Sequence, residues 1–235
     1  MSTSNKNVII DTAYGNITGK NSIDKISLTG VYPYEGSTYS QEMELILNID
    51  KGKSVSIKFP YDGYNLQLFI GDFNGDRKSE IMVRGGFGGS GGFEIGVIYK
   101  YQDNTLIAIF NQDMFTDNNT CTAKFKDNYK VHINCTDKKY SIDISSRPKD
   151  YLDLIYNNDG TVKSGVTVSV DPPEGIYPIK QVSNHYYNLL IFQRIVGIVN
   201  ADTLGVIQSM SNLLDDKYNL EYKGLLLVPS PIGEK

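Results

Sequence analysis

Oxygen-bearing side chains alternate along one short segment of the chain. Asp72, Asn74 and Asp76 are each separated by a single residue, and Glu80 follows shortly after. A tight turn can direct alternating side chains toward one point, where the backbone carbonyl of Lys78 adds a further oxygen. Calcium takes about six to eight oxygen ligands, whereas Mg²⁺ demands a stricter octahedral geometry. The segment therefore predicts a Ca²⁺ site formed by Asp72, Asn74, Asp76, Lys78 and Glu80.

The spacing excludes an EF-hand. Such a loop needs Gly at its sixth position and Glu at its twelfth, where this chain has Arg77 and Val83. The flanking residues also alternate between apolar and polar, which is typical of strands and not of helices.

The same alternation runs through most of the chain and predicts an all-β fold. Helices are expected only at Pro148–Tyr156 and Ser209–Asp216. The segment 72–80 has partial copies 56 residues earlier, at Asn16–Asp24, and 108 residues later, at Lys180–Asn188. This spacing predicts one domain over residues 1–235, with degenerate repeats that start near 14, 70, 122 and 176.

About four units of four strands suit a small propeller-like array, and a β-sandwich is the alternative. In the propeller, the strand Val8–Thr12 would close the ring beside Tyr222–Val228.

The turn and its strands resemble the FG-GAP or VCBS-type repeat, a bacterial β-propeller unit whose acidic loop binds calcium. The resemblance covers Ile70–Tyr101 best, then Tyr14–Gly30, and least Ile179–Gln208. It implies the same five ligands and a structural calcium ion. Arg77 stands where that family usually has Gly, which predicts modest affinity if the position needs positive φ.

The other two copies of the turn lack ligands and are expected to be metal-free. Lys20 replaces a carboxylate in the first copy, and Lys180 and Val182 remove two ligands from the last.

A glycine-rich run at 85–92 matches the spacing of two functional patterns, one that binds phosphate and one that positions a catalytic serine. Gly86, Gly88 and Gly91 fit G-x-G-x-x-G, and Ser90 sits at the centre of a G-x-S-x-G. Both patterns need a helix immediately afterwards, but Phe93–Tyr99 has the composition of a strand. We therefore expect a backbone-exposed connection at a ligand-facing rim, with similar connections at 35–37 and 200–202.

Composition limits the partners. The chain has 235 residues with 23 Lys and Arg against 27 Asp and Glu, a net charge of −4. This mild acidity disfavours nucleic acid and anionic membranes. No apolar run is long enough to span a bilayer, and no signal peptide is visible at the start.

Two cysteines, Cys121 and Cys135, flank a hairpin expected to turn at Asp127 and Asn128. Pairing about this turn sets them opposite each other, so a disulfide is geometrically possible. Two free buried thiols in a cytosolic protein are the alternative.

We expect a non-enzymatic calcium-binding scaffold or a module that binds a protein or carbohydrate surface. The resemblance implies a location on the bacterial envelope or spore; a cytoplasmic location is the alternative. The other hypothesis for function is a glycan- or cell-wall-active hydrolase that uses loop carboxylates. Its candidate acids are Glu94, Asp113, Asp117, Asp143, Asp150 and Asp153.

Overall fold

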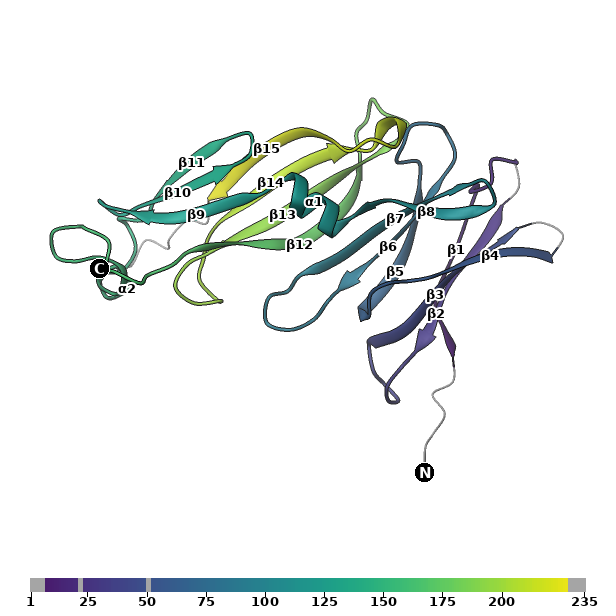
Figure 1. Ribbon diagram of the computed structural model, residues 1–235, viewed down its shortest axis with the longest axis horizontal. Coiled ribbons are helices and arrows are strands. Elements are labelled where there is room, and N and C mark those ends of the chain that lie inside the picture. Colours follow the sequence, from purple (N-terminus) through teal and green to yellow (C-terminus); the bar gives the residue numbers. More distant parts are fainter. Residues whose placement is uncertain (1–6, 21–22, 50–51, 228–235) are drawn as a thin grey trace.

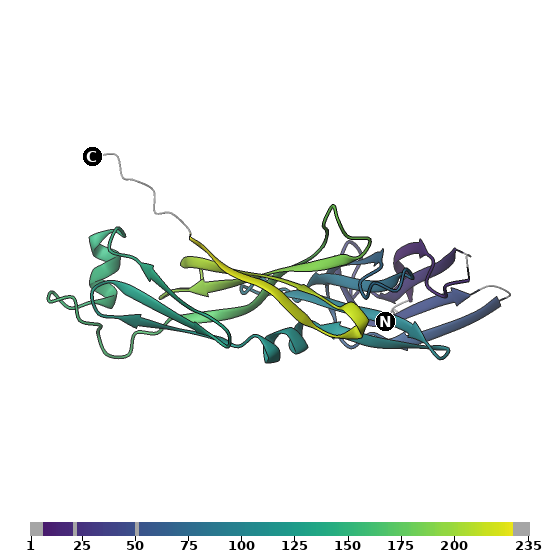
Figure 2. The same ribbon diagram turned by 90° about the horizontal axis from the view of Figure 1, so that it is seen from above.

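The computed structural model describes residues 7–20, 23–49 and 52–227. It is an elongated, all-β molecule built from antiparallel sheets with short helices between them (Figures 1 and 2). The all-β class expected from the alternating sequence is therefore confirmed. The strands form three sheets, which pack on one another through three apolar cores.

The N-terminal half consists of two four-stranded meanders. The first contains β1 (Val8–Gly15), β2 (Asp24–Val31), β3 (Tyr39–Ile49) and β4 (Lys53–Lys58). The second contains β5 (Gly63–Gly71), β6 (Glu80–Gly86), β7 (Glu94–Gln102) and β8 (Thr105–Asn111). A short pairing of β3 with β5 joins the meanders into one eight-stranded sheet, which folds over so that its two parts enclose a core.

The two central strands of the second meander, β6 and β7, are largely buried on both faces. Ile81 and Val83 of β6 point into the core shared with the first meander, whereas Met82 between them points into a core shared with the C-terminal sheet. Successive residues of a strand face opposite sides of the sheet. The nearly continuous apolar sequence of β6 and β7 thus reflects a middle layer.

The C-terminal half pairs a small sheet with a larger one. Helix α1 (Gln112–Asn118) leads into β9 (Cys121–Lys126), β10 (Lys130–Cys135) and β11 (Lys139–Asp143), followed by α2 (Lys149–Ile155). The larger sheet runs in the order β12 (Ser169–Lys180), β13 (Tyr187–Val196), β14 (Thr203–Asn212) and β15 (Asn219–Leu227), with a short 3₁₀ turn at Leu214–Asp216 before β15. Of the two expected helices, the first is found, whereas residues 209–212 continue β14 because Ser209 and Ser211 pair with neighbouring strands.

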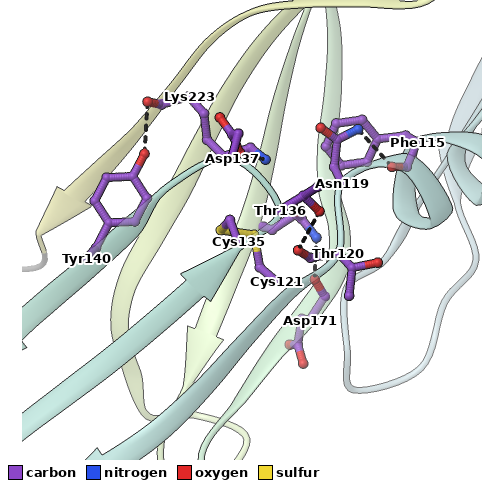
Figure 3. Close-up of a disulfide and its surroundings, with 11 residues drawn as sticks. Phe115, Asn119, Thr120, Cys121, Cys135, Thr136, Asp137, Tyr140, Asp171 and Lys223 are labelled. Atoms are coloured by element: carbon purple, nitrogen blue, oxygen red, sulfur yellow. Dashed lines mark hydrogen bonds and ion pairs between the residues drawn. A yellow bond between two sulfur atoms is a disulfide. The ribbon is translucent and has the colours of Figure 1, made fainter.

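A disulfide links the ends of β9 and β10. Cys121 and Cys135 are directly opposed in the register of the hairpin, and Thr136 N–H donates to Thr120 O beside them (3.2 Å; Figure 3). Nearby, the buried ammonium of Lys223 on β15 pairs with Asp137 (2.7 Å). The cross-strand disulfide considered from the sequence is present, and it ties the small sheet where its hairpin meets the larger one.

The propeller interpretation is wrong. In the described part of the chain no propeller closes: β1 pairs only with β2, and β15 pairs with β14 in a different sheet. The expected ring closure between Val8–Thr12 and Tyr222–Val228 is therefore not formed, and Val228 itself lies outside the described residues. Packed antiparallel sheets agree with the sandwich alternative. Repeats starting near 14, 70, 122 and 176 stay a prediction.

Candidate functional site

The acidic turn between β5 and β6 is held by its own side chains. The Asp72 carboxylate accepts hydrogen bonds from the N–H groups of Gly75 (2.7 Å) and Arg77 (3.0 Å). Asn74 Oδ1 accepts from Asp76 N–H (3.0 Å), and the Asp76 carboxylate accepts from Lys78 N–H (2.8 Å). These are the local bonds that Asp and Asn side chains form in tight turns.

The buried carboxylate of Glu80 closes the same turn through backbone hydrogen bonds. It accepts from the N–H groups of Phe73 (2.7 Å) and Asn74 (3.3 Å), and only 1% of the residue is exposed. Burial, together with the charges of Asp76 and Asp72, raises the pKa of Glu80 to about 7 against the effect of these two bonds.

Two lysine side chains, Lys78 and Lys100, lie beside the acidic turn. Lys100 Nζ on β7 lies 3.9 Å from the Asp76 carboxylate and 2.6 Å from that of Asp216. Lys78 Nζ lies 4.0 Å from the Asp76 carboxylate. Two ammonium groups thus lie within 4.0 Å of the Asp76 carboxylate in the described structure.

The five sequence-predicted ligands lie in one turn, but their carboxylates do not surround a common point. Within the described ranges, no group of three or more His, Cys, Asp or Glu side chains is arranged to hold a metal ion. In the described structure the side-chain oxygens of Asp72, Asn74 and Asp76 accept hydrogen bonds from backbone N–H groups of the turn. Calcium binding by Asp72, Asn74, Asp76, Lys78 and Glu80 remains an untested prediction.

One hollow lies at the acidic turn and is lined by Asp76, Lys78 and Lys100 among others, and another lies beside the glycine-rich connection between β6 and β7. The second of these has a volume of about 360 Å³. Its lining consists of amide, charged and aromatic side chains and exposed glycine backbone from β5, β6, β7 and β12: Asn65, Gln67, Arg84, Gly85, Gly86, Gly92, Phe93, Glu94 and Glu174. The sequence-based expectation of a rim at 85–92 agrees with this position, and no helix follows the glycines.

A charged pair forms one wall of this hollow. Arg84 donates to Glu94 Oε1 from both Nε (2.8 Å) and Nη2 (2.6 Å), and Ile176 N–H donates to Glu94 Oε2 (3.1 Å). Burial raises the pKa of Glu94, although Arg84 and the Ile176 bond oppose the rise. The Arg84 guanidinium also lies 4.6 Å from the ring centroid of Tyr177. Both carboxylate oxygens of Glu94 are therefore occupied within the protein.

Another hollow, of about 220 Å³, adjoins the one beside the glycine-rich connection. Asn65 and Gln67 line both hollows, and Tyr32 and Thr38 line only the smaller one. Ser40 also lines the smaller hollow; the residue is 1% exposed, and its Oγ has no hydrogen-bond partner in the described structure. We call these two adjoining hollows the polar groove.

The rim of the polar groove is tied to the C-terminal sheet. Asn200, in the connection between β13 and β14, donates from Nδ2 to Ser90 O in the glycine-rich connection (2.6 Å). The two connections identified as similar in sequence therefore meet in space. Arg194 reaches the same region: it donates to Asn200 Oδ1 (2.9 Å) and pairs with Asp171 (3.1 Å).

Sequence reasoning found part of this groove. Glu94 was one of the candidate acids and lines the groove, whereas the other five lie on α1, β11 and α2 and are absent from its lining. Asn65, Gln67 and Glu174 were missed because isolated polar residues on strands carry no spacing signal. Asn65 has one unusual property, a positive φ of 50°, which no sequence pattern reveals.

Comparison with known proteins places the chain in a family. Residues 119–226 match the family described as the YybI C-terminal domain. The uncharacterised protein YybI of Bacillus subtilis (strain 168) is 31% identical over 211 residues, which cover 88% of this chain and 80% of the relative.

The chain belongs to the YybI family.

This membership overturns the resemblance to FG-GAP or VCBS-type repeats. The matching family is YybI, and the described strands form no closed propeller. The acidic spacing on which the resemblance rested also satisfies hydrogen bonds of the turn itself. No solved structure matches this member of the YybI family.

The match to the YybI C-terminal domain begins just before the disulfide hairpin and ends within β15. Glu174 lies inside this region, whereas Asn65, Gln67 and Arg84 precede it. The alignment with YybI extends well beyond the C-terminal domain, because it covers most of the chain. Among the described residues, neither helix is long and apolar enough to cross a membrane.

Proposed function

We propose that this YybI-family protein is a non-enzymatic surface-binding module that holds a carbohydrate polymer in its polar groove. The observation that carries the proposal is that Asn65 and Gln67 line both hollows, which places the two side by side. A groove, in contrast to a closed cavity, lets a chain-like ligand enter at one end and leave at the other.

The lining suits a ligand rich in hydroxyl groups. Amide side chains offer donors and acceptors together, and serine and threonine hydroxyls can do either. Asn65 and Gln67 are exposed and line both hollows, and the exposed Thr38 lines the smaller one. Phe93 supplies an apolar surface for the face of a sugar ring. Few apolar and several convergent polar groups favour a sugar over a lipid-like molecule.

The alternative function, a glycan hydrolase, rests on the two glutamates of the larger hollow of the polar groove. Glycosidases generally need one carboxyl group as an acid and another as a base or nucleophile. Glu94 accepts three hydrogen bonds from Arg84 and Ile176, which use most of the roughly four acceptor positions of a carboxylate. Glu174 alone cannot provide both roles, so binding is the better-supported function.

The disulfide supports a location where thiols are oxidised. Disulfides persist outside the reducing cytosol, and Cys121 and Cys135 are bonded in this fold. We infer that the protein works at the bacterial envelope or spore surface. Titration of free thiols in protein taken directly from its native cell fraction tests this inference; two free thiols per chain would contradict it.

Co-sedimentation with insoluble polysaccharides tests binding. Purified cell-wall material, chitin and cellulose would each be incubated with the full chain, and the bound fraction measured. We expect at least one polymer to retain the wild-type protein and Asn65→Ala with Gln67→Ala to lose most of this retention. Asn158→Ala with Gln102→Ala removes an exposed Asn and an exposed Gln outside the groove and serves as the matched control.

Two results would contradict the proposal. Equal retention of both double variants would show that the polar groove is not the binding surface. Release of reducing sugar that disappears in Glu94→Gln would establish the hydrolase in its place.

A further inference from the structure

The larger hollow of the polar groove contains more negative than positive charge. Arg84, Glu94 and Glu174 line it, and Arg194 and Asp171 form an ion pair behind Glu174. Two cationic and three anionic groups give 2 − 3 = −1. The surplus negative charge can be assigned to one residue because the other four are paired at hydrogen-bond distance.

That residue is Glu174. Its carboxylate lies 3.8 Å from Arg194 Nε, too far for a hydrogen bond. The same arginine donates from Nη2 to Asp171 and Asn200 instead, and its buried Nε has no partner in the described structure. Burial raises the pKa of Glu174 despite the nearby Arg194 charge. A cation that enters the hollow would therefore stabilise the ionised carboxylate of Glu174.

Resting on the proposed function, we infer that the polar groove selects carbohydrate polymers that carry free amino groups, with Glu174 receiving the ammonium. A hexosamine without its acetyl group places an ammonium on a ring whose hydroxyls can contact Asn65 and Gln67. A charge-assisted hydrogen bond from ammonium to carboxylate is stronger than a neutral one. Polymers of sugar acids would instead bring a second negative charge toward Glu174.

Two oligosaccharides of equal length test this selection. The probes are a β-1,4-linked glucosamine oligomer and its fully N-acetylated counterpart, titrated into the full chain by calorimetry at low salt. We expect the wild-type protein to bind the free-amine oligomer at least about tenfold more tightly, the range of a charged hydrogen bond. In Glu174→Gln this preference should disappear, so that the two affinities become equal.

Asp117→Asn is the matched control, because it removes one exposed carboxylate on α1 outside the groove. It should keep the preference, which would exclude a general effect of net charge. Thermal melts of each variant would verify that the fold is retained.

The outcomes separate the two proposals. Equal wild-type affinity for both oligomers, or a preference that survives in Glu174→Gln, overturns the amine selection while groove binding stands. If neither oligomer binds and the polysaccharide co-sedimentation also fails, groove binding itself is refuted.

Discussion

Two turns at equivalent places in the N-terminal meanders share the same backbone hydrogen bonds to a closing carboxylate but differ in the side chains between. The turn between β1 and β2 ends at Asp24, and the turn between β5 and β6 ends at Glu80, 80 − 24 = 56 residues later. In each, the carboxylate accepts from two successive N–H groups near the start of the turn. Gly19 and Gly75, also 56 apart, both adopt positive φ (73° and 83°).

The difference lies in the residues between the shared anchors. The first turn leaves Asn16 Oδ1 buried without a partner in the described structure, whereas Asp72 at the equivalent position accepts two backbone bonds. The second turn also contacts the C-terminal sheet: Tyr187 N–H donates to Asp72 O (2.6 Å), and Asp215 N–H donates to Asn74 O (3.2 Å). The turn with the additional acidic residues is therefore also the turn whose backbone carbonyls accept hydrogen bonds from the C-terminal sheet and the 3₁₀ turn before β15.

A calcium-like spacing can arise from the hydrogen-bonding needs of a backbone turn. Alternating Asp and Asn side chains accept from N–H groups two or more residues ahead, which is how Asp72, Asn74 and Asp76 are used. The left-handed φ of Arg77 (68°) shows that the turn keeps its shape without the glycine expected at this position.

The largest expected effect concerns the apolar residue that each turn buries. Phe73 is 0% exposed and packs against the rings of Phe69 and Tyr187, while Ile17 is 1% exposed in the N-terminal core. We expect Phe73→Ala to lower the free energy of unfolding by about 3–5 kcal/mol and Ile17→Ala by about 2–5 kcal/mol. Urea denaturation measures both.

Phe73→Leu serves as the control because it keeps most of the buried volume and should lose less than Phe73→Ala. A greater loss from Ile17→Ala than from Phe73→Ala would show that the first turn, not the second, is the more strongly packed.

The next effect concerns the closing carboxylates. Glu80→Ala leaves two N–H groups without their acceptor, and Asp24→Ala does the same at Ile17 and Thr18. Each unsatisfied buried donor costs about 1–3 kcal/mol, so both variants should be destabilised by similar amounts. Glu80→Gln retains one acceptor oxygen and should lose less than Glu80→Ala in the same urea titration.

If only one of the two alanine variants is destabilised, the closing carboxylates of the two turns do not have equivalent roles. Amide hydrogen exchange at Phe73 and Ile17 would then show which N–H group has found another acceptor.

The positions of the two closing carboxylates could be predicted from the sequence, but the hydrogen bonds that they accept could not. The 56-residue shift located Asp24 and Glu80 because apolar, glycine and acidic positions recur. The alternating strands were also visible, since each has at least one apolar face. The sequence could not show that β6 is buried on two sides, because Met82 and Ile81 are equally apolar. It could not reveal the polar groove, because Asn65 and Glu174 come to line one hollow only through long-range packing, in which β12 contacts β7.

A smaller effect with opposite signs is expected at the first position of the two turns. Asp72→Ala removes two partly exposed hydrogen bonds and should cost about 1–2 kcal/mol. Asn16→Ala removes a buried oxygen that has no partner in the described structure, so it should be neutral or slightly stabilising. Paired urea titrations decide; equal destabilisation of both variants would mean that Asn16 has an acceptor role in solution.

Calcium gives the smallest expected effect and the sharpest test of how the second turn differs from the first. A ligand that binds only the folded state stabilises it by about 2.7 kcal/mol at a concentration one hundred times its Kd. Because the oxygens of Asp72 and Asn74 serve backbone N–H groups and Lys100 lies 3.9 Å from Asp76, we expect the Tm to be the same in millimolar calcium and in chelator. Asp72→Ala with Asp76→Ala is the comparison variant. A calcium-dependent rise in the wild-type Tm that this double variant abolishes would show instead that the acids turn from the backbone to the ion, and that the two turns differ in chemistry as well as in packing.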